Sequence, residues 1–185
     1  MMTNVTRRSL LLAGASTIFA GTAALAEVKK IPRSHGPTTM EIVPFQSSER
    51  VGTIIISNKD LTLHRIVGQG KAERYKIAAG RDGFIWEGTT TVGHKAKWPA
   101  WRPPAAMRKR DTSLPAYVPP GPYNPLGARA LYLYDNGRDT LYRIHGTNDN
   151  TTIGGFETSG CFRMTNADVM SLYNKVRSGT KVIVR

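Results

Sequence analysis

The sequence predicts a mainly β domain with one or two short helices, and three of its features favour this class. Residues 53–78 contain short runs rich in β-branched residues, separated by turns with Gly or Asn, as in an antiparallel meander. Residues 128–145 contain two further strand-like runs on either side of an Asn-Gly dipeptide, a strong short-range signal for a hairpin. A clear helical pattern follows at residues 165–179.

Two regions of the chain are therefore expected to form strands. The strands are predicted at residues 53–57, 61–67, 74–78, 128–134 and 140–145. Because side chains alternate along a strand, Leu141, Arg143 and His145 should share one face of the last of them. His145 is the last residue of that strand, and the strand should hold its imidazole in a fixed position.

The expected helix begins at Thr165, because Thr165 and Asp168 have the spacing of a capping box. Gly179 suits its end, and residues 181–185 are expected to add a last strand. The apolar residues at helical spacing, which we expect to pack against the sheet, are Val169, Leu172, Tyr173 and Val176.

The chain has 185 residues, which is enough for one domain with a sizeable core. Its 26 Lys and Arg residues outnumber 13 Asp and Glu residues, and the formal net charge of +13 is typical of proteins that bind nucleic acid or an anionic surface. The amino terminus decides between these partners. It has the features of an export signal, so we expect anionic envelope polymers and no nucleic acid.

The predicted leader, residues 1–26, has a basic start, an uncharged apolar stretch and an Ala-Leu-Ala end, as in a secretory signal peptide. The pair Arg7-Arg8 resembles the twin-arginine export variety. We expect cleavage after Ala26 and a periplasmic protein. The alternative is an uncleaved membrane anchor, since Ser9 to Ala26 is 18 residues long, although its Gly, Ser and Thr content makes it a weak span.

After the leader, we expect a flexible linker at residues 27–42 and one domain at residues 43–185. Within that domain, residues 99–125 hold eight of the chain's eleven prolines and a basic run, Arg108-Lys109-Arg110. So long a connection without regular structure is usually functional or disordered. We favour a loop beside a functional site over a rigid surface loop.

The only cysteine, Cys161, lies 16 positions after His145, and residues 146–160 between them are rich in Gly and small polar residues. That composition is typical of a loop folded back on itself. A thiolate is a strong nucleophile toward acyl groups, and a nearby imidazole can take the thiol proton and return it to a leaving amine. The spacing alone leaves a small buried cysteine and a structural histidine as alternatives. A single cysteine excludes an intramolecular disulfide.

The sequence around this pair resembles the catalytic domain of the L,D-transpeptidases, the YkuD-like cysteine transpeptidases of the bacterial cell wall. The matching parts are Ile-His-Gly-Thr at 144–147, Thr-Ser-Gly-Cys-Phe-Arg-Met at 158–164, the helix after them, and Gly-Thr-Lys-Val-Ile-Val at 179–184. The resemblance covers residues 43–185. It implies a sandwich of curved mixed β-sheets with a catalytic cleft along one side.

Carried over by position, the resemblance implies that Cys161 is the nucleophile and His145 the general base and acid. Gly146 would orient the imidazole through its backbone carbonyl, and Gly160, with Cys161, would offer a backbone N–H to the oxyanion. Many members of the family have Ser-His-Gly-Cys, whereas this chain has Ser159 in the place of that histidine. No second histidine would therefore substitute for His145.

The expected substrate-binding residues are Arg163, Thr158 and Ser159, which the resemblance implies, and Trp98 and Trp101, which the composition of the proline-rich segment indicates. Arg163 would pair with a stem-peptide carboxylate and favour the thiolate, and a structural ion pair is the alternative. We expect the two tryptophans and the cations of the proline-rich loop to contact glycan or peptide carboxylates.

The activity implied is transfer of a peptidoglycan tetrapeptide through a Cys161 thioester, with release of D-alanine and formation of a 3→3 cross-link. No metal or cofactor would be needed, and carbapenems would be covalent inhibitors. The same residues would serve an L,D-carboxypeptidase, or a ligase that attaches an envelope protein to peptidoglycan. A non-catalytic wall-binding module is the remaining interpretation.

Overall fold

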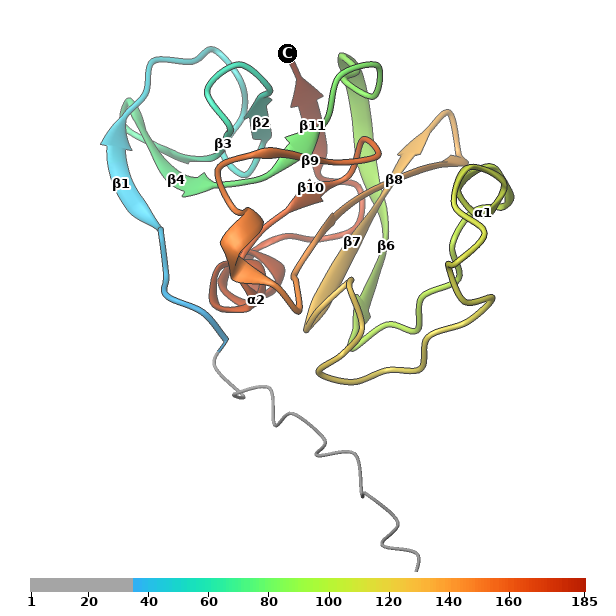
Figure 1. The fold of residues 1–185 in the computed structure, drawn as a ribbon. Coiled ribbons are helices and arrows are strands. Elements are labelled where there is room, and N and C mark those ends of the chain that lie inside the picture. The colour runs from blue at the N-terminus through green and yellow to red at the C-terminus, as the bar shows by residue number, and fades with distance from the viewer. Residues whose placement is uncertain (1–34) are drawn as a thin grey trace, which may run out of the picture. The chain divides into compact units, whose positions relative to one another are not determined.

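The computed structural model describes residues 35–185 (Figure 1). The predicted leader, residues 1–26, and residues 27–34 lie outside the described residues. The strands are β1 (Glu41–Pro44), β2 (Ile54–Ser57), β3 (Thr62–Gly68), β4 (Lys71–Lys76), β5 (Ala79–Gly80), β6 (Gly88–Lys97), β7 (Arg129–Asp135), β8 (Arg138–His145), β9 (Phe156–Thr158), β10 (Phe162–Arg163) and β11 (Lys181–Val184). The helices are α1 (Ala105–Arg110) and α2 (Asn166–Lys175), with a short 3-10 helix, η1 (Asn150–Thr152).

The strands of residues 35–185 form two sheets. The larger, nine-stranded sheet has the order β1-β4-β3-β2-β11-β6-β7-β8-β10, and β5 and β9 form a parallel pair. In the larger sheet β11 is parallel to β2 and β10 is parallel to β8, whereas the other neighbours are antiparallel. This mixed arrangement confirms the predicted fold class. No helix of the described residues is long and apolar enough to cross a membrane.

Two predicted supersecondary units are present. Strands β2, β3 and β4 form the antiparallel meander, and β7 and β8 form the hairpin. The hairpin turns tightly because Asn136 and Gly137 both adopt positive φ, 47° and 75°, which is the conformation that Asn-Gly favours. The second strand of this hairpin carries His145 to the edge of the large sheet, where β10 adds to it.

The longest described strand, β6, is not among the predicted elements. Its sequence, Gly-Thr-Thr-Thr-Val-Gly-His-Lys-Ala-Lys, lacks a regular apolar alternation, and pairing with β11 on one side and β7 on the other decides its conformation. Helix α1 is a second departure, because it interrupts the proline-rich segment 99–125 that was expected to lack regular structure.

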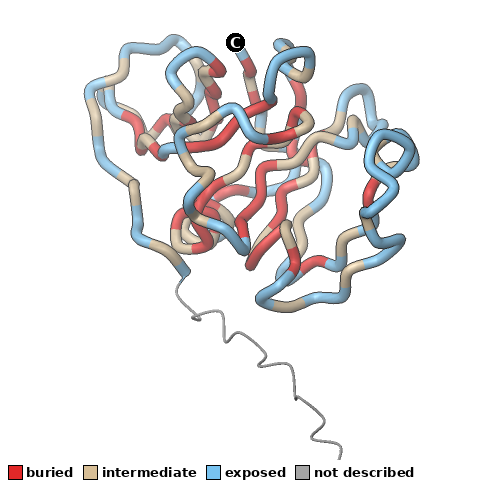
Figure 2. Tube along the Cα trace, in the orientation of Figure 1, coloured by how far each residue is buried: buried red, intermediate tan, exposed pale blue. Residues whose placement is uncertain are grey.

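The main hydrophobic core lies between the large sheet and α2, and Figure 2 shows the buried stretches gathered there. Ile144 of β8 and Phe162 of β10 are fully buried in it. Val169 and Leu172 on one face of α2 are also fully buried, as their helical spacing predicts. The core therefore supports the pair of strands that carries His145.

Helix α2 is held at both ends. The Thr165 hydroxyl caps its start by accepting from the Asp168 N–H at 3.1 Å, as the capping motif predicts. At the other end the Lys95 ammonium of β6 donates to the carbonyls of Tyr173, at 2.7 Å, and Val176. A cation on the last carbonyls of a helix also complements its dipole, so α2 is fixed against the sheet.

An N-terminal strap, residues 35–40, crosses the start of α2. The fully buried Asp168 carboxylate accepts from the Thr38 hydroxyl at 2.8 Å and from the Thr39 N–H and hydroxyl at 3.0 and 2.7 Å. Strand β1 then pairs with β4. The expectation of a flexible linker at residues 27–42 is therefore wrong for its described part, because a buried carboxylate requires hydrogen-bond donors and the strap supplies them.

We expect Asp168→Ala to lower the free energy of unfolding by about 2–4 kcal/mol, because the donors of the strap lose their charged acceptor. Urea unfolding followed by circular dichroism measures this change. Glu41→Gln is the control, since it breaks an exposed ion pair with Arg74 and should cost less than about 1 kcal/mol. Equal losses in the two variants would contradict the role given to the strap.

Candidate active site

The candidate active site forms where β8 and β10 run side by side. The two strands are parallel over two residue pairs, Ile144 with Phe162 and His145 with Arg163. Cys161 directly precedes this pairing, so it stands diagonally across from His145. Both residues line one cavity. The fold thus brings together the expected nucleophile and base.

The His145 ring is held by its neighbour in the chain. Its Nδ1 lies 2.6 Å from the carbonyl oxygen of Gly146, which is the contact expected from the sequence. Because a carbonyl only accepts, Nδ1 carries the proton of the neutral ring and Nε2 is left as the base. The residue is buried, with 5% of its surface exposed, which restricts the ring to this orientation.

Asn166, at the start of α2, fixes the chain around Gly146. Its Oδ1 accepts from the backbone N–H groups of Ala128 and Thr147, at 2.8 and 3.2 Å, and its Nδ2 donates to the Thr147 carbonyl at 2.7 Å. A Cβ added to Gly146 would lie 2.2 Å from Asn166 Oδ1. The family resemblance implies a role only for the carbonyl of Gly146, and the structure adds that a side chain does not fit there.

The turn before Cys161 is built by Thr158. Its hydroxyl donates to the Cys161 carbonyl at 2.6 Å and accepts from the Gly160 N–H at 3.2 Å. Gly160 has φ 103°, a conformation that favours glycine. Both groups are hydrogen-bonded within the turn, and Thr158 also lines the smaller of the two cavities beside Cys161. Their expected roles toward the oxyanion and the substrate stay predictions.

Trp86 supports this turn, and sequence reasoning missed it. Its indole N–H donates to the Gly160 carbonyl at 2.9 Å. Its ring stacks on Tyr142 of β8, with 4.5 Å between centroids, and contacts Phe162 at 5.6 Å. A lone tryptophan in a Gly-containing segment carries no signal of such a role, because its partners come from distant parts of the chain.

Burial keeps both reactive groups neutral in the resting site. It raises the pKa of the half-buried Cys161 thiol, against the Arg143 backbone N–H and the guanidinium groups of Arg143 and Arg163, which lower it. Burial first, and Arg163 second, lower the pKa of His145 to about 3, against the Gly146 carbonyl. Arg163 favours the thiolate as expected, but its effect is smaller than that of burial. The thiol must therefore give its proton to His145 during attack.

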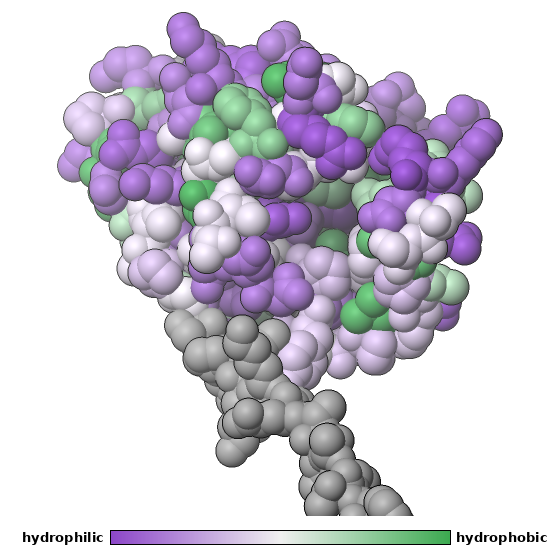
Figure 3. Space-filling model, in the orientation of Figure 1, coloured by the Kyte–Doolittle hydropathy of each residue, from purple (hydrophilic) through white to green (hydrophobic). Residues whose placement is uncertain are grey.

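Cys161 lies between two cavities on one face of the molecule, and Figure 3 shows that face hollowed between the part that carries α1 and the part that carries β9. The larger cavity, of about 610 Å³, is lined by residues 140–143 of β8. The smaller, of about 310 Å³, is lined by His145 and Arg163. Cys161 and Ser159 line both, so a group bound in either cavity reaches the sulfur.

The proline-rich segment 99–125 forms part of the wall of both cavities, so it lies beside the site as expected. Trp101, Met107 and Arg110 line both of them. Trp98 lines neither of these two cavities, and its backbone N–H donates to the Ala128 carbonyl at 2.8 Å. Its substrate-binding role stays a prediction.

Charged groups of both signs line the smaller cavity, namely Arg81, Arg110, Asp111, Glu157 and Arg163. The Arg163 guanidinium donates to the Thr152 hydroxyl at 2.8 Å, and its buried Nε has no partner among the described residues. No ion pair joins Arg163 to a carboxylate within residues 35–185. This favours a substrate role for Arg163 over a structural ion pair.

Arg81 is a cavity residue that sequence reasoning did not assign, whereas Arg110 belongs to the basic run of the proline-rich segment that was expected beside the site. Their guanidinium groups lie over the ring of Phe84, at 4.6 and 4.8 Å from its centroid. Phe84 therefore connects the segment after β5 to α1 across the cavity. The basic run at residues 108–110 was a visible signal for Arg110, whereas nothing in the sequence distinguishes Arg81. The described part of the chain has no group of three or more His, Cys, Asp and Glu that could hold a metal ion.

A thiol directly before β10 and a neutral imidazole at the end of the adjoining strand β8, beside two cavities, define a candidate acyl-transfer enzyme. Residues 52–184 match the L,D-transpeptidase catalytic domain family, YkuD. The chain belongs to this family.

Among curated relatives, the chain is 46% identical over 97 residues to the probable L,D-transpeptidase ErfK/SrfK of Escherichia coli K12, a match that covers 50% of this chain and 30% of the relative. It is 33% identical over 133 residues to the putative L,D-transpeptidase YqjB of Bacillus subtilis, covering 70% of this chain and 69% of that protein. The match to ErfK/SrfK thus spans about a third of the relative's length.

Two solved structures have the same fold. A Brucella melitensis chain described as a probable carnitine operon oxidoreductase is 41% identical, with a TM-score of 0.55, covering 79% of this chain and 92% of that chain. L,D-transpeptidase 3 of Mycobacterium tuberculosis is 16% identical, with a TM-score of 0.54, covering 73% of this chain and 61% of that chain. The second likeness concerns the fold alone.

Because burial raises the pKa of the Cys161 thiol, the fraction of thiolate is lower at every pH than for a free cysteine. We expect alkylation of Cys161 by iodoacetamide to increase with pH through an inflection above the ordinary value of about 8.5. Mass spectrometry of the modified chain across a pH series measures it, with glutathione as the reference thiol. Fast alkylation with a plateau from mildly acidic to neutral pH would indicate a thiolate–imidazolium pair and contradict a neutral one.

Proposed function

We propose that this chain is a peptidoglycan L,D-transpeptidase that forms 3→3 cross-links between stem peptides through a thioester on Cys161. The observation that carries the proposal is the position of the thiol between two cavities, of which the smaller contains His145. A transpeptidase has to bind an acyl donor and an amine acceptor at one sulfur, and two cavities supply room for both. A hydrolase needs room for one peptide only.

The position of His145 decides which part of the substrate binds in each cavity. His145 protonates the leaving amine and later deprotonates the attacking amine, so both amines must occupy its side of the sulfur, the smaller cavity. The acyl part of the donor then occupies the larger cavity, beside residues 140–143. The leaving group and the acceptor therefore occupy the smaller cavity one after the other.

The reaction has two balanced steps. In the first, Cys161 Sγ bonds to the carbonyl carbon of the third stem residue, the bond from that carbon to D-alanine breaks, and the thiol proton passes through His145 to the leaving amine. In the second, a side-chain amine of a neighbouring stem bonds to the same carbon and the C–S bond breaks. His145 carries the amine proton back to sulfur. The Gly160 N–H already donates to the Thr158 hydroxyl. Of the two N–H groups expected to bind the oxyanion, we therefore assign the role to that of Cys161.

Arg163 is the proposed partner of the carboxylate that leaves with D-alanine. Its buried Nε, which has no partner within residues 35–185, and the guanidinium groups of Arg81 and Arg110 make the smaller cavity favourable to an anion. Asp111 and Glu157 line the same cavity and suit the ammonium group of the acceptor before it loses its proton. Ser159, which lines both cavities, would contact donor and acceptor.

The alternatives differ in the acceptor. Water would make the chain an L,D-carboxypeptidase, and an amine of an envelope protein would make it a ligase to peptidoglycan. A non-catalytic wall-binding module would not need the buried, oriented His145. The oxidoreductase activity named for the Brucella chain is not proposed for this one, because the family match and the arrangement of nucleophile and base favour acyl transfer.

Two further expectations belong to this proposal. The predicted leader would export the chain to the periplasm, where peptidoglycan is found. Carbapenems would acylate Cys161. Two solved structures of similar fold, each 16% identical, hold covalent adducts of other inhibitors, namely a faropenem-derived adduct on Mycobacterium tuberculosis L,D-transpeptidase 3 and an avibactam carbamoyl enzyme, and these support the broader expectation of inhibitors of the β-lactam type.

Mass spectrometry of the purified chain with disaccharide-tetrapeptide tests the function, with Cys161→Ala as control. Cross-linked dimers and free D-alanine, both absent in the control, are the expected products. Tripeptide monomers alone would replace the proposal with a carboxypeptidase. If no product forms, a carbapenem adduct on Cys161 would point to a missing protein acceptor, and the lack of an adduct would overturn the catalytic role.

Gly146→Ala tests the support of the base. The added Cβ would displace the Asn166 amide or the Gly146 carbonyl, and a shift of this kind in a catalytic group costs about 10²-fold in rate, so we expect such a fall in kcat for D-alanine release. Gly93→Ala is the control, because a Cβ there would be similarly crowded, 2.4 Å from the Tyr134 ring, whereas neither Gly93 nor Tyr134 lines the two cavities. Unchanged kcat in Gly146→Ala would refute the close contact.

A further inference from the structure

Strand β8 has a bulge directly beside Cys161. Between the pairs Tyr132–Arg143 and Tyr134–Asp139, β8 contains two more residues than β7. Leu141 lies inside this bulge and has φ 65°, in the left-handed region that a residue such as leucine seldom adopts. A conformation of this kind persists only where its surroundings hold it.

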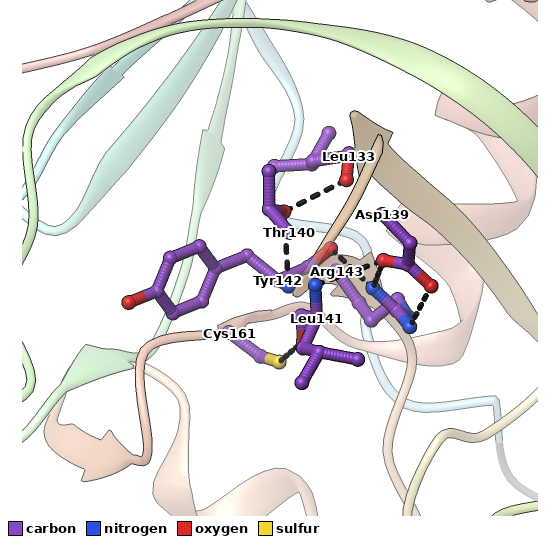
Figure 4. A network of polar contacts seen from close by, with 7 residues as sticks. All are labelled: Leu133, Asp139, Thr140, Leu141, Tyr142, Arg143 and Cys161. Carbon is purple, nitrogen blue, oxygen red and sulfur yellow. Dashed lines mark hydrogen bonds and ion pairs between the residues drawn. The ribbon is translucent and has the colours of Figure 1, made fainter. Parts of the chain in front are cut away.

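The Asp139 carboxylate holds Leu141 (Figure 4). Its Oδ1 accepts from the Leu141 N–H at 2.8 Å, which replaces a ladder bond lost in the bulge. The same carboxylate accepts hydrogen bonds from both terminal nitrogens of Arg143, at 2.6 and 2.8 Å. The Arg143 guanidinium lies over the ring of Tyr132, 4.3 Å from its centroid. Asp139 is therefore itself fixed in place.

Thr140 holds the other side of the bulge. Its hydroxyl donates to the Leu133 carbonyl of β7 at 2.7 Å and accepts from the Tyr142 N–H at 3.1 Å. Two adjacent side chains, Asp139 and Thr140, thus bond the backbone N–H groups of the two residues that follow. These contacts define the bulge from both sides.

The bulge is in direct contact with the reactive thiol. The Leu141 carbonyl accepts from the Cys161 thiol, with 3.8 Å between oxygen and sulfur, and Figure 4 shows the side chain of Cys161 pointing toward it. Strand β10 begins only at Phe162, so its pairing with β8 does not extend to Leu141. The thiol therefore occupies an edge position of β8 that a strand would otherwise fill.

We propose that Asp139 is a positioning residue of this active site. By holding Leu141 in the left-handed conformation it aims the Leu141 carbonyl at the Cys161 thiol, and so fixes the sulfur between the two cavities. The role of this contact in turnover rests on the proposed function, whereas its effect on the thiol itself does not. A regular strand at residues 140–142 would turn the carbonyl away and leave the thiol without this acceptor.

Leu141→Val and Leu141→Gly test the contact at the thiol. Glycine adopts positive φ freely, whereas β-branched valine does not, and neither change alters the charged groups around the sulfur, Arg143, Asp139 and Arg163. Without its acceptor the neutral thiol is less stable, so we expect iodoacetamide to alkylate Cys161 in Leu141→Val about three- to ten-fold faster at neutral pH, with the inflection at lower pH. Leu141→Gly should keep the inflection of the wild type.

Asp139→Asn and Asp139→Ala provide an independent test. Asparagine retains an oxygen that accepts from the Leu141 N–H, and alanine does not. We expect kcat for D-alanine release to fall at least about ten-fold more in Asp139→Ala than in Asp139→Asn, with KM changed less than about three-fold, because a misplaced nucleophile impairs the chemical step. Equal losses would mean that the ion pair with Arg143, and not the hold on Leu141, is what matters, and would overturn the proposal.

Thermal melting of each variant separates these effects from unfolding. If Leu141→Val is folded and keeps the wild-type alkylation profile, the proposal is overturned; if it does not fold, the Asp139 pair decides. If the wild type releases no D-alanine, the proposed function fails, and the alkylation profiles of Asp139→Asn and Asp139→Ala still decide the contact at the thiol.

Discussion

The short parallel pairing of β8 with β10 is the constraint on which the rest of the site depends. His145 and Cys161 are separated by residues 146–160, which include η1 and β9, so direct sequence neighbourhood does not keep them together. Ile144 and Phe162, opposite each other and fully buried, fix the register. A slip of β10 by one residue would turn Phe162 to the other face of the sheet, and the core would lose it.

Hydrogen bonds to the backbone supplement this pairing. Asn166, Thr158 and Trp86 bond the carbonyl and N–H groups that flank the reactive residues, and none of these bonds uses the thiol or the free imidazole nitrogen. Their removal would leave buried polar groups unsatisfied, at about 1–3 kcal/mol each. The site is therefore organised before any substrate binds, which is what stabilisation of a transition state requires.

The parts predictable from the sequence are those with a local cause. Asn136-Gly137 encodes its hairpin, and Thr165 encodes the start of α2, because the contacts lie within a few residues. The bulge around Leu141 could not be predicted, since its run alternates like a regular strand and leucine ordinarily avoids positive φ. The same holds for the Gly160 N–H. The family motif suggests an oxyanion donor, and only the position of the Thr158 hydroxyl decides where that N–H points.

The charges around the sulfur act differently at rest and during reaction. At rest, burial outweighs the guanidinium groups of Arg143 and Arg163, so the thiol keeps its proton. As the bond to carbon begins to form, proton transfer to His145 leaves negative charge on sulfur and on the substrate oxygen, and both arginines then lie close to a charge that was absent before. Both arginines also lower the pKa of His145, so their attraction for the sulfur is offset in part by repulsion of the imidazolium. Their net contribution to kcat is the difference between these two effects. The same burial that prevents ionisation of the free thiol strengthens this attraction, because fewer water molecules screen it.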